Sequence, residues 1–351
     1  MAIAFTAGAA WSAGLDGALQ PVAVFGEDDR VAPPPELERA TEGLGLLFNR
    51  RTGAVCTAVC LADSAIATAA HCLYRPAGKV APRLADVWFA RGYDRVRDFA
   101  RIQGHDRGAA AQSVIAGTER ISTDPPITAT RDWALVRLSR PVCAGRSLPA
   151  VAMDRAQISE AAEAGRLFQL AYHRDFQQWR PAYSKPCALW KPAEPGAVED
   201  ALKEFAEPER LVLHTCDTGG GSSGSPLLVR EPGGRIVVAG LNVGTYVQAR
   251  SLLQNGEVVR RLEPQVVANS SIAGVAFVGR VAALQSARIL ATRDGVRAVQ
   301  AALLRQGHYA GPIDGVFTAA VRSAIERYEG SAGLPVTGIA SQALLERLSR
   351  R

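Results

Sequence analysis

Residues 56–72 have the sequence CTAVCLADSAIATAAHC, the stretch that says most about the fold of this chain. Two short apolar runs, 54–61 and 65–68, are separated here by polar residues, as expected for neighbouring strands. His71 follows the second run directly after two alanines, whose small side chains leave room beside an imidazole. A lone histidine is usually structural, but the chain has only 5. His71 is therefore a candidate functional residue.

The same pattern extends outward over residues 26–284. Short apolar runs there are separated by Gly, Pro, Asp and Asn, and clear examples are Leu44–Phe48, Trp133–Leu138, Ile236–Val243 and Ile272–Val278. This spacing is typical of an antiparallel all-β sandwich or barrel. Only residues 159–164 and 198–205 favour helices, and both segments are polar enough to lie on the surface.

The period of the apolar residues becomes helical after about residue 288. Val296, Val299 and Leu303 recur at i, i+3 and i+7 behind Asp294, a candidate N-cap. Three short helices are predicted on this basis, around residues 296–303, 321–328 and 343–348, the last of them behind Ser341.

Length and composition set the domain organisation. Because 351 residues exceed one ordinary core, we expect a leader at 1–20, a β domain at 21–287 and a helical domain at 293–351. The leader begins MAIAFTAGAAWSA and resembles the apolar end of a secretory signal, although no Lys or Arg precedes Arg30. An alanine-rich leader without a targeting role is the alternative. No apolar run reaches the roughly 18 residues of a transmembrane segment.

Charge and cysteine content narrow the partners and the compartment. The net charge of +6 comes almost entirely from arginines spread along the chain, which favours a solvated surface over a nucleic-acid site. The 6 cysteines form no C-x-x-C pair, so they suit disulfides rather than a zinc ribbon. We therefore predict an oxidising compartment, and neither a metal ion nor an organic cofactor.

Two further stretches carry chemistry. GSSGSP at 221–226, preceded by TGG at 218–220, contains the candidate nucleophile Ser223. A nucleophilic serine needs a tight turn and backbone N–H groups that face a developing oxyanion, and neighbouring glycines permit both. By itself such a stretch is more often a flexible loop. Asp132 opens an apolar run in RDWALV at 131–136, and alone it would be a turn residue capping a strand.

Together these residues resemble the trypsin-like serine endopeptidases of the chymotrypsin fold. His71, Asp132 and Ser223 follow the family's chain order, and residues 56–72 match its histidine loop without a gap. The resemblance covers residues 20–285. It implies an all-β chymotrypsin-like fold of two antiparallel six-stranded barrels, followed here by the small all-α three-helix domain.

The resemblance also implies an activity, the hydrolysis of protein or peptide substrates. Ser223 would be the nucleophile, His71 the general base and Asp132 the group that orients His71. The N–H groups of Gly221 and Ser223 would form the oxyanion hole. The alternative is a catalytically silent binding or scaffold protein on the same fold, which a Gly221 N–H turned away from the site would favour.

Three positions bear on the branch within the family. Ser222 stands where trypsin has an aspartate that pairs with the N-terminus freed by zymogen cleavage, so activation by that ion pair is not expected. The GSSGSP form and VFGEDDR at 24–30 are similar to the bacterial glutamyl-endopeptidase-like branch. Thr218 matches the pocket threonine of that branch, but Asn242 replaces its pocket histidine. Glutamate specificity is therefore not predicted.

Asp217 has two interpretations. It lies six residues before Ser223, where trypsin keeps its pocket-floor aspartate, and a carboxylate there would select Arg or Lys in the substrate. It also follows Cys216, and a disulfide at that place would turn the carboxylate into a structural hydrogen bond. The structural role is preferred, and the sequence leaves both roles open.

The resemblance implies two disulfides. Cys56 pairs with Cys72, closing the loop that presents His71, and Cys187 pairs with Cys216 before the nucleophile loop. The remaining two cysteines, Cys60 and Cys143, either pair by elimination or remain buried thiols.

The C-terminal segment resembles the peptidoglycan-binding-like domain of bacterial envelope proteins. The resemblance rests on VQ at 299–300, LL at 303–304, GPIDGVF at 311–317 and GLPVTG at 333–338. Thr318 and Tyr328-Glu329 depart from the usual motif. Residues 293–351 are thus expected to bind peptidoglycan or another envelope polymer, with the alternative of a helical appendage without wall affinity. The expected location is the bacterial periplasm or the exterior.

Overall fold

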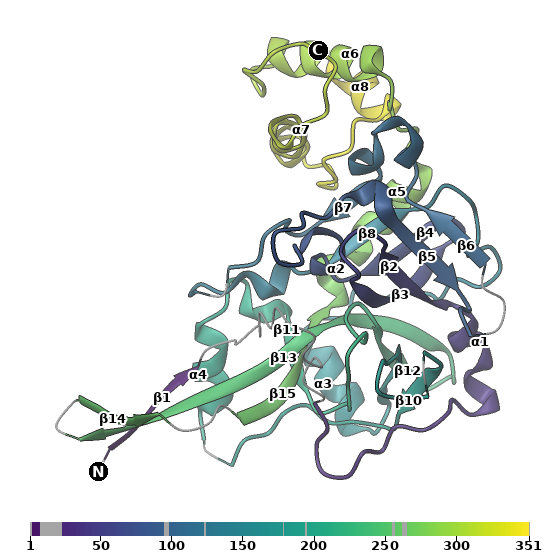
Figure 1. The fold of residues 1–351 in the computed structure, drawn as a ribbon. Coiled ribbons are helices and arrows are strands. Elements are labelled where there is room, and N and C mark those ends of the chain that lie inside the picture. Colours follow the sequence, from purple (N-terminus) through teal and green to yellow (C-terminus); the bar gives the residue numbers. More distant parts are fainter. Residues whose placement is uncertain are drawn as a thin grey trace.

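The computed structural model describes residues 2–7, 23–94, 98–122, 124–177, 179–193, 195–254, 257–261 and 265–350 (Figure 1). Of the leader predicted at residues 1–20, only residues 2–7 are described. Two β-sheets and a C-terminal group of helices make up this part of the chain.

The first sheet contains seven antiparallel strands in the order β6-β5-β2-β3-β4-β8-β7. Their bounds are β2 Leu44–Asn49, β3 Val55–Ala62, β4 Ala65–Thr68, β5 Val87–Arg91, β6 Asp98–Arg101, β7 Val114–Ala116 and β8 Ala134–Arg137. A bridge between Ile102 and Leu138 joins the ends of β6 and β8, which closes the sheet into a barrel. Its core includes Ile66, Phe89 and Leu135, each 0% exposed.

The second sheet has eight strands, six of them in the order β10-β9-β12-β13-β15-β11, with β1 and β14 pairing to β13. Their bounds are β1 Ala2–Ala7, β9 Leu167–Tyr172, β10 Pro181–Ser184, β11 Leu211–His214, β12 Pro226–Arg230, β13 Ile236–Gln254, β14 Glu257–Arg261 and β15 Gln265–Ala273. Leu189, beyond β10, bridges His214 in β11, so this sheet also closes on itself. The prediction of two antiparallel barrels followed by helices is confirmed, with seven strands in the first sheet and with β1 and β14 added to the six of the second.

Short helices lie around the barrels. They are α1 Glu38–Glu42, α2 His71–Tyr74, α3 Arg155–Glu163, α4 Ala197–Lys203 and α5 Val281–Ser286. Helices α3 and α4 fall on the two segments for which the sequence favoured helices. No helix among the described residues is long and apolar enough to cross a membrane.

The C-terminal helical module consists of α6 Arg293–Arg305, α7 Ala319–Ser331 and α8 Gln342–Ser349 (Figure 1). Val299, Leu303 and Ile325 lie in its separate core, as their helical period predicts. The predicted N-cap Asp294 is wrong. Thr292 caps α6 instead, accepting the Gly295 N–H at 3.1 Å, because its side chain precedes the helix and faces the free N–H groups of the first turn.

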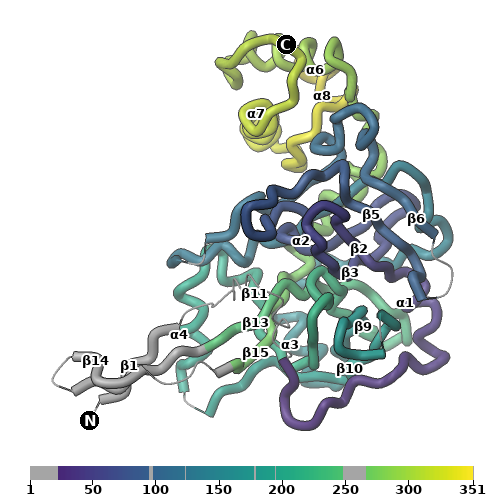
Figure 2. Tube along the Cα trace, viewed as in Figure 1, coloured from purple at the N-terminus to yellow at the C-terminus, as the bar shows by residue number. Residues whose placement is uncertain are grey.

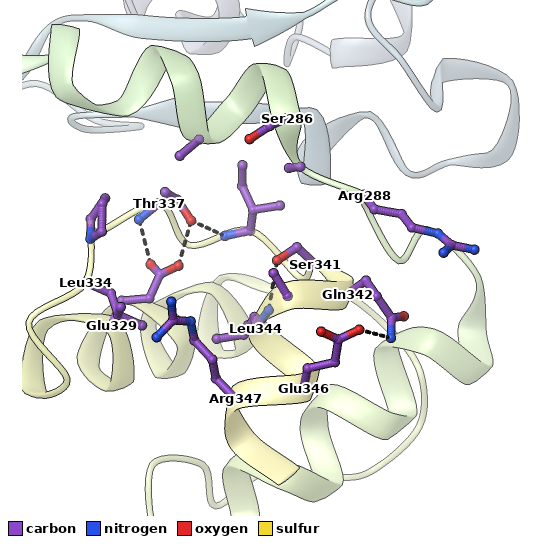
Figure 3. A pocket seen from close by; sticks show the side chains of 15 residues that line it. Ser286, Arg288, Glu329, Leu334, Thr337, Ser341, Gln342, Leu344, Glu346 and Arg347 are labelled. Carbon is purple, nitrogen blue, oxygen red and sulfur yellow. Dashed lines mark hydrogen bonds between the residues drawn. The ribbon is translucent and has the colours of Figure 1, made fainter. Parts of the chain in front are cut away.

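The loop before α8 is held by a buried carboxylate. Glu329 of α7 accepts the Thr337 N–H at 2.6 Å, the Thr337 hydroxyl at 2.7 Å and the Gly338 N–H at 2.9 Å (Figure 3). Burial raises the pKa of Glu329, while these donors oppose that shift. The departure from the usual motif at this position therefore has a structural role.

The module is docked on the first barrel rather than only tethered to it. Arg322 of α7 donates to the carbonyl oxygens of Val114 at 2.8 Å and Ala111 at 2.5 Å. Arg280 donates to the Val336 carbonyl at 2.8 Å. Ile339, which precedes α8, is 2% exposed and belongs to the large core cluster of the barrels. The two parts thus share a buried contact.

A chain that ends at residue 291 is expected to remain folded, because it keeps α5, whose Leu284 is 0% exposed against the first barrel. Loss of the Arg322 hydrogen bonds and the Ile339 contact should lower its melting temperature by about 5 °C, since each kcal/mol is worth roughly 2–4 °C in a domain of this size. Thermal unfolding by circular dichroism measures this shift, and full-length Arg322→Ala, which removes the two Arg322 hydrogen bonds and leaves the Ile339 and Arg280 contacts, should shift less. An unfolded truncated protein would contradict the expectation.

Candidate active site

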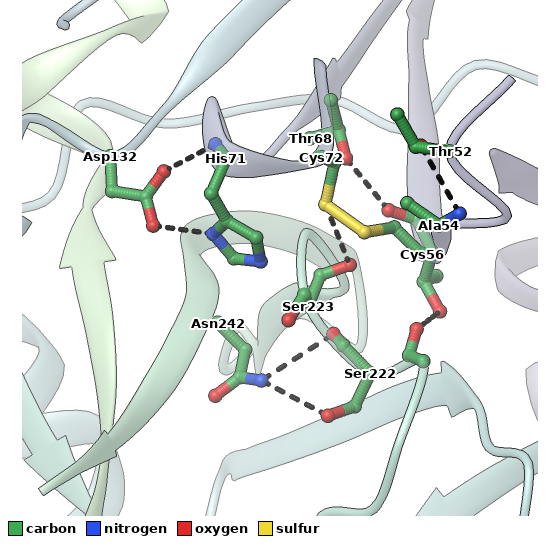
Figure 4. The surroundings of a disulfide bond; sticks show 12 residues. Thr52, Ala54, Cys56, Thr68, His71, Cys72, Asp132, Ser222, Ser223 and Asn242 are labelled. Atoms are coloured by element: carbon green, nitrogen blue, oxygen red, sulfur yellow. Dashed lines mark hydrogen bonds and ion pairs between the residues drawn. A yellow bond between two sulfur atoms is a disulfide. The ribbon is translucent and has the colours of Figure 1, made fainter. Parts of the chain in front are cut away.

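His71 and Asp132 come together at the edge of the first barrel (Figure 4). His71 opens α2, two residues after the fully buried Ala69, and Asp132 lies just before β8. The Asp132 carboxylate is 0% exposed and uses both oxygens on the histidine. One lies 2.6 Å from His71 Nδ1, and the other accepts the His71 backbone N–H at 2.8 Å. This pair fixes the ring, with Nδ1 protonated and Nε2 turned the other way.

Ser223 lies in the turn between β11 and β12 of the second barrel. Figure 4 shows its side chain near the Nε2 edge of the His71 ring, opposite the edge that faces Asp132. Thr57 of β3 holds this turn: its N–H donates to the Ser223 carbonyl at 2.9 Å and its hydroxyl to the Gly221 carbonyl at 2.9 Å. Sequence analysis missed Thr57, although a polar residue in an apolar run was a usable indication.

The glycines on either side of Ser223 are required by the geometry. Gly221 has φ +99° and Gly224 has φ +80°, in the left-handed region that side chains disfavour. A Cβ on Gly224 would lie 2.2 Å from Thr68 Oγ1. The Ser223 turn therefore packs directly against the strand that leads to His71.

Two peptide groups of this turn have their carbonyls turned into the protein. The Gly220 carbonyl accepts the Arg174 N–H at 2.6 Å, and the Ser222 carbonyl accepts the Ser225 N–H at 2.9 Å. In a trans peptide the N–H points opposite to the C=O. The N–H groups of Gly221 and Ser223 are thus turned away from those partners, and neither donates to another group among the described residues.

The Asp217 carboxylate accepts hydrogen bonds from backbone N–H groups of residues 25–29. Its two oxygens accept the Phe25 N–H at 2.9 Å and the Asp29 N–H at 3.0 Å. Burial raises the pKa of Asp217, and these two donors work against that shift.

The other two candidate pocket residues are also buried. Thr218 is 4% exposed and forms a backbone bridge with Ala23. Asn242 is 2% exposed, and its Nδ2 faces the Ser222 hydroxyl at 3.3 Å (Figure 4).

Three disulfides are formed: Cys56–Cys72, Cys60–Cys143 and Cys187–Cys216. The first and third confirm the predicted pairs, and the second decides the alternative that the sequence left open. Two groups of side chains, Cys56-His71-Cys72 and Cys187-His214-Cys216, have ligand atoms within 4.8 Å of one another. Their sulfurs are in disulfides and offer no thiolate to a metal ion.

Two buried histidines, His173 and His214, accept hydrogen bonds from the chain that leads to the Ser223 turn. His173 Nδ1 accepts the Gly219 N–H at 3.0 Å, and His214 Nδ1 accepts the Cys216 N–H at 3.2 Å. Burial lowers the pKa of each to about 3, and the nearby Arg30 charge adds to this for His173. Both rings are therefore neutral acceptors at neutral pH. Neither residue was singled out from the sequence, because the Gly219 N–H lies far from His173 in the chain and His214 Nε2 faces Ser271 Oγ of another strand at 2.8 Å.

Residues 56–239, more than half of the 351 residues, match the model of the trypsin-like peptidase domain. The chain belongs to the trypsin-like peptidase family. In this trypsin-like peptidase, residues 292–348 also match a model described as a putative peptidoglycan binding domain. That match coincides with the module α6–α8.

One solved structure with a similar chain is described as a Glu endopeptidase in complex with MPD. The likeness has a TM-score of 0.47 at 15% sequence identity, and it covers 75% of this chain and 99% of that chain. No curated protein sequence matches this trypsin-like peptidase.

The pKa values of the buried histidines predict acid sensitivity. A folded-state pKa of about 3 against an ordinary value of 6.5 means that the unfolded chain binds protons first. The stabilising effect of a neutral His214 is complete above about pH 6.5 and is lost as the pH falls toward 3. Urea unfolding at a series of pH values should show this decline in the unfolding free energy, reduced in His214→Gln. His105→Gln is the matched control, and an equal reduction in both variants would contradict the prediction.

Proposed function

We propose that this protein is a serine endopeptidase that hydrolyses protein or peptide bonds through an acyl-enzyme at Ser223. The observation that carries the proposal is the doubly bonded Asp132–His71 pair beside the Ser223 turn. A buried carboxylate is costly unless it is paired and hydrogen-bonded, and here both bonds of Asp132 go to His71. This is the arrangement that activates a serine hydroxyl.

In the proposed reaction, His71 Nε2 accepts the proton of the Ser223 hydroxyl as its oxygen attacks the substrate carbonyl carbon. Asp132 keeps Nδ1 protonated, so that Nε2 is free to act as the base, and stabilises the imidazolium that forms. His71 then gives the proton to the leaving amine as the C–N bond breaks. Water repeats the sequence on the acyl-enzyme and releases the second product.

The N–H groups of Gly221 and Ser223 are proposed to bind the oxyanion. Their orientation supports this role. The carbonyls on the other side of the same peptides, those of Gly220 and Ser222, accept hydrogen bonds from the Arg174 and Ser225 N–H groups. In a silent relative the Gly221 N–H is expected to turn away. The peptidase interpretation is therefore preferred over a scaffold on the same fold.

Substitution of the triad provides the first test. Ser223→Ala and His71→Ala should each lower kcat on a peptide substrate by at least about 10⁴-fold, and Asp132→Asn by about 10⁴-fold through the wrong tautomer. A fluorophosphonate should label the folded wild type at Ser223 and not the Ser223→Ala variant. Ser331→Ala, which changes an exposed serine of α7, is the control for serine substitution outside the site. Absence of both hydrolysis and labelling in folded wild type would refute the enzyme.

For Asp217 we propose a structural role rather than a charge at the floor of the specificity pocket. Its two backbone bonds leave the carboxylate compensated by the segment at Phe25 and Asp29. Asp217→Asn should therefore leave the residue preference at the scissile bond unchanged in a peptide-library profile. The same variant should lower the unfolding free energy by about 1–3 kcal/mol, because one N–H then faces an NH2 group. Cleavage after Arg or Lys that disappears in this variant would make Asp217 the pocket residue.

We propose further that the protein works outside the cytoplasm, in the periplasm or after secretion, and that the module binds a cell-wall polymer. Three disulfides and the peptidoglycan-binding family match support this location. A cavity of about 400 Å³ between α5 and α8 is the proposed polymer site (Figure 3). Its walls include Ala287 and Leu344, and the exposed Arg288 and Arg347 at its edges suit polymer carboxylates.

Sedimentation with isolated cell-wall sacculi tests this targeting. Full-length protein should co-sediment, and a chain ending at residue 291 should remain in the supernatant. Arg347→Ala should bind more weakly than Arg305→Ala, the matched control in α6 outside the cavity. Equal binding by full-length and truncated protein would remove the targeting role.

A further inference from the structure

Ser222 stands where trypsin has the aspartate that pairs with a freed N-terminus, so the Gly221 peptide of this chain needs another source of order. The structure offers one in three consecutive residues, 173–175, which we call the strap. His173 accepts the Gly219 N–H at 3.0 Å, and Arg174 donates its N–H to the Gly220 carbonyl at 2.6 Å. The strap therefore sets the direction in which the Gly221 N–H points.

The third residue of the strap, Asp175, binds a buried arginine. Arg30 Nη2 lies 2.8 Å from Asp175 Oδ2, and the Arg30 side chain is only 3% exposed. Arg30 also donates from Nε and Nη2 to the Asp28 carboxylate at 2.8 and 2.7 Å. The contact with the loop is close: a Cβ on Gly219 would lie 2.1 Å from Asp175 Oδ1 and 2.8 Å from Arg30 Nη1.

Arg30 belongs to residues 23–31, which are fastened to the same barrel by backbone bonds. Ala23 and Thr218 exchange both backbone bonds, at 2.9 and 3.0 Å, and Val31 does the same with Tyr183. Figure 2 shows this part of the chain, in purple, running along the outside of the second barrel toward α1. The guanidinium is thus delivered to the strap by a segment that is anchored on both sides of it.

Fork geometry explains why the residue is an arginine. Its planar guanidinium serves the carboxylates of Asp28 and Asp175 at once, which a lysine ammonium does as a point charge without the fixed fork. The pair of carboxylates also compensates a charge that is buried at this depth. Removing the guanidinium would leave Asp175 beside the Gly219 backbone without its cation.

We propose that Arg30 is a positioning residue for the oxyanion hole: through Asp175 it holds the strap, and the strap holds the Gly220–Gly221 peptide with its N–H toward the substrate carbonyl. This inference rests on the proposed function. It means that residues 23–31 take the place of the ion pair that orders this loop in trypsin. Arg30 does not touch the substrate.

Kinetics of the full-length chain test the proposal. Arg30→Met should lower kcat by about 10- to 100-fold with KM changed less than about 3-fold, because an oxyanion-hole donor acts in the transition state and its full loss is worth about 10²–10³ in kcat. A peptide aldehyde inhibitor, which forms an oxyanion with Ser223, should lose affinity by a similar factor. Arg30→Lys should recover part of both losses. Arg235→Met removes an exposed pair with Glu231 and is the matched control, expected to behave as wild type.

Asp175→Asn provides a second variant that keeps the shape of the strap and removes its charge. It should reproduce the kcat loss of Arg30→Met, including if the latter fails to fold. Unchanged kcat and aldehyde affinity in either folded variant would overturn the proposal. A rise in KM alone would also overturn it, since that would indicate a role in substrate binding.

Amide hydrogen exchange separates this inference from the proposed function. Peptides covering residues 219–225 should exchange faster in Asp175→Asn than in wild type and Arg235→Met. This readout needs no turnover. If wild type has no activity, the proposed function fails, while faster exchange in Asp175→Asn still supports the inference that the strap orders the loop at 219–225. Identical exchange in all three proteins would overturn the inference that the strap orders this loop, whatever the activity.

Discussion

The candidate site depends on the hydrogen bonds between strand β3 of the first barrel and the Ser223 turn of the second. Thr57 in β3 is 0% exposed and binds the Ser223 and Gly221 carbonyls through its N–H and hydroxyl. Its neighbour Cys56 is joined to Cys72, the residue directly after His71. The candidate base His71 and the candidate nucleophile Ser223 come from different barrels, but Cys56 and Thr57, two adjacent residues of β3, hold both. Their relative position is therefore a property of one rigid strand rather than of two loops.

The charges around this strand are compensated where they lie. Asp132 has two N–H partners on His71, and Asp217 has two on the N-terminal segment. Arg30 is paired with Asp28 and Asp175. The buried histidines His173 and His214 are neutral, since their low pKa values keep them as acceptors. Because each of these ions has its own partner, the region between them carries little uncompensated charge.

The helical module adds a fixed second surface to the peptidase. A flexible tether would raise the local concentration of a polymer without fixing its direction. Here Arg322 binds two carbonyls of the first barrel and Ile339 enters its core, so the module keeps one orientation. A polymer held in the cavity beside α5 would then lie at a set distance from the Ser223 turn. The carboxylate of Glu329 supports this arrangement by holding the loop that carries Ile339.

The sequence by itself determined which part of the chain forms strands and which forms helices, through the period of its apolar residues. The candidate triad and the pairs Cys56–Cys72 and Cys187–Cys216 came from the resemblance to the trypsin-like endopeptidases, which rests on the residues around His71, Asp132 and Ser223. Such information lies within a few neighbouring residues, so the sequence alone contains it. The cap of α6 shows its limit, because the sequence predicted Asp294, whereas Thr292 makes the capping hydrogen bond to the Gly295 N–H.

Only the tertiary structure decided the partners of polar groups that are far apart in the chain. The position of Asp217 in the sequence left two roles open, and one partner of its carboxylate is the Phe25 N–H, 192 residues earlier. The roles of Thr57, Arg30 and His173 also depend on segments that meet when the second barrel closes. A hydrogen bond needs two groups within about 3 Å, and the sequence states which groups exist but not which of them folding brings to that distance.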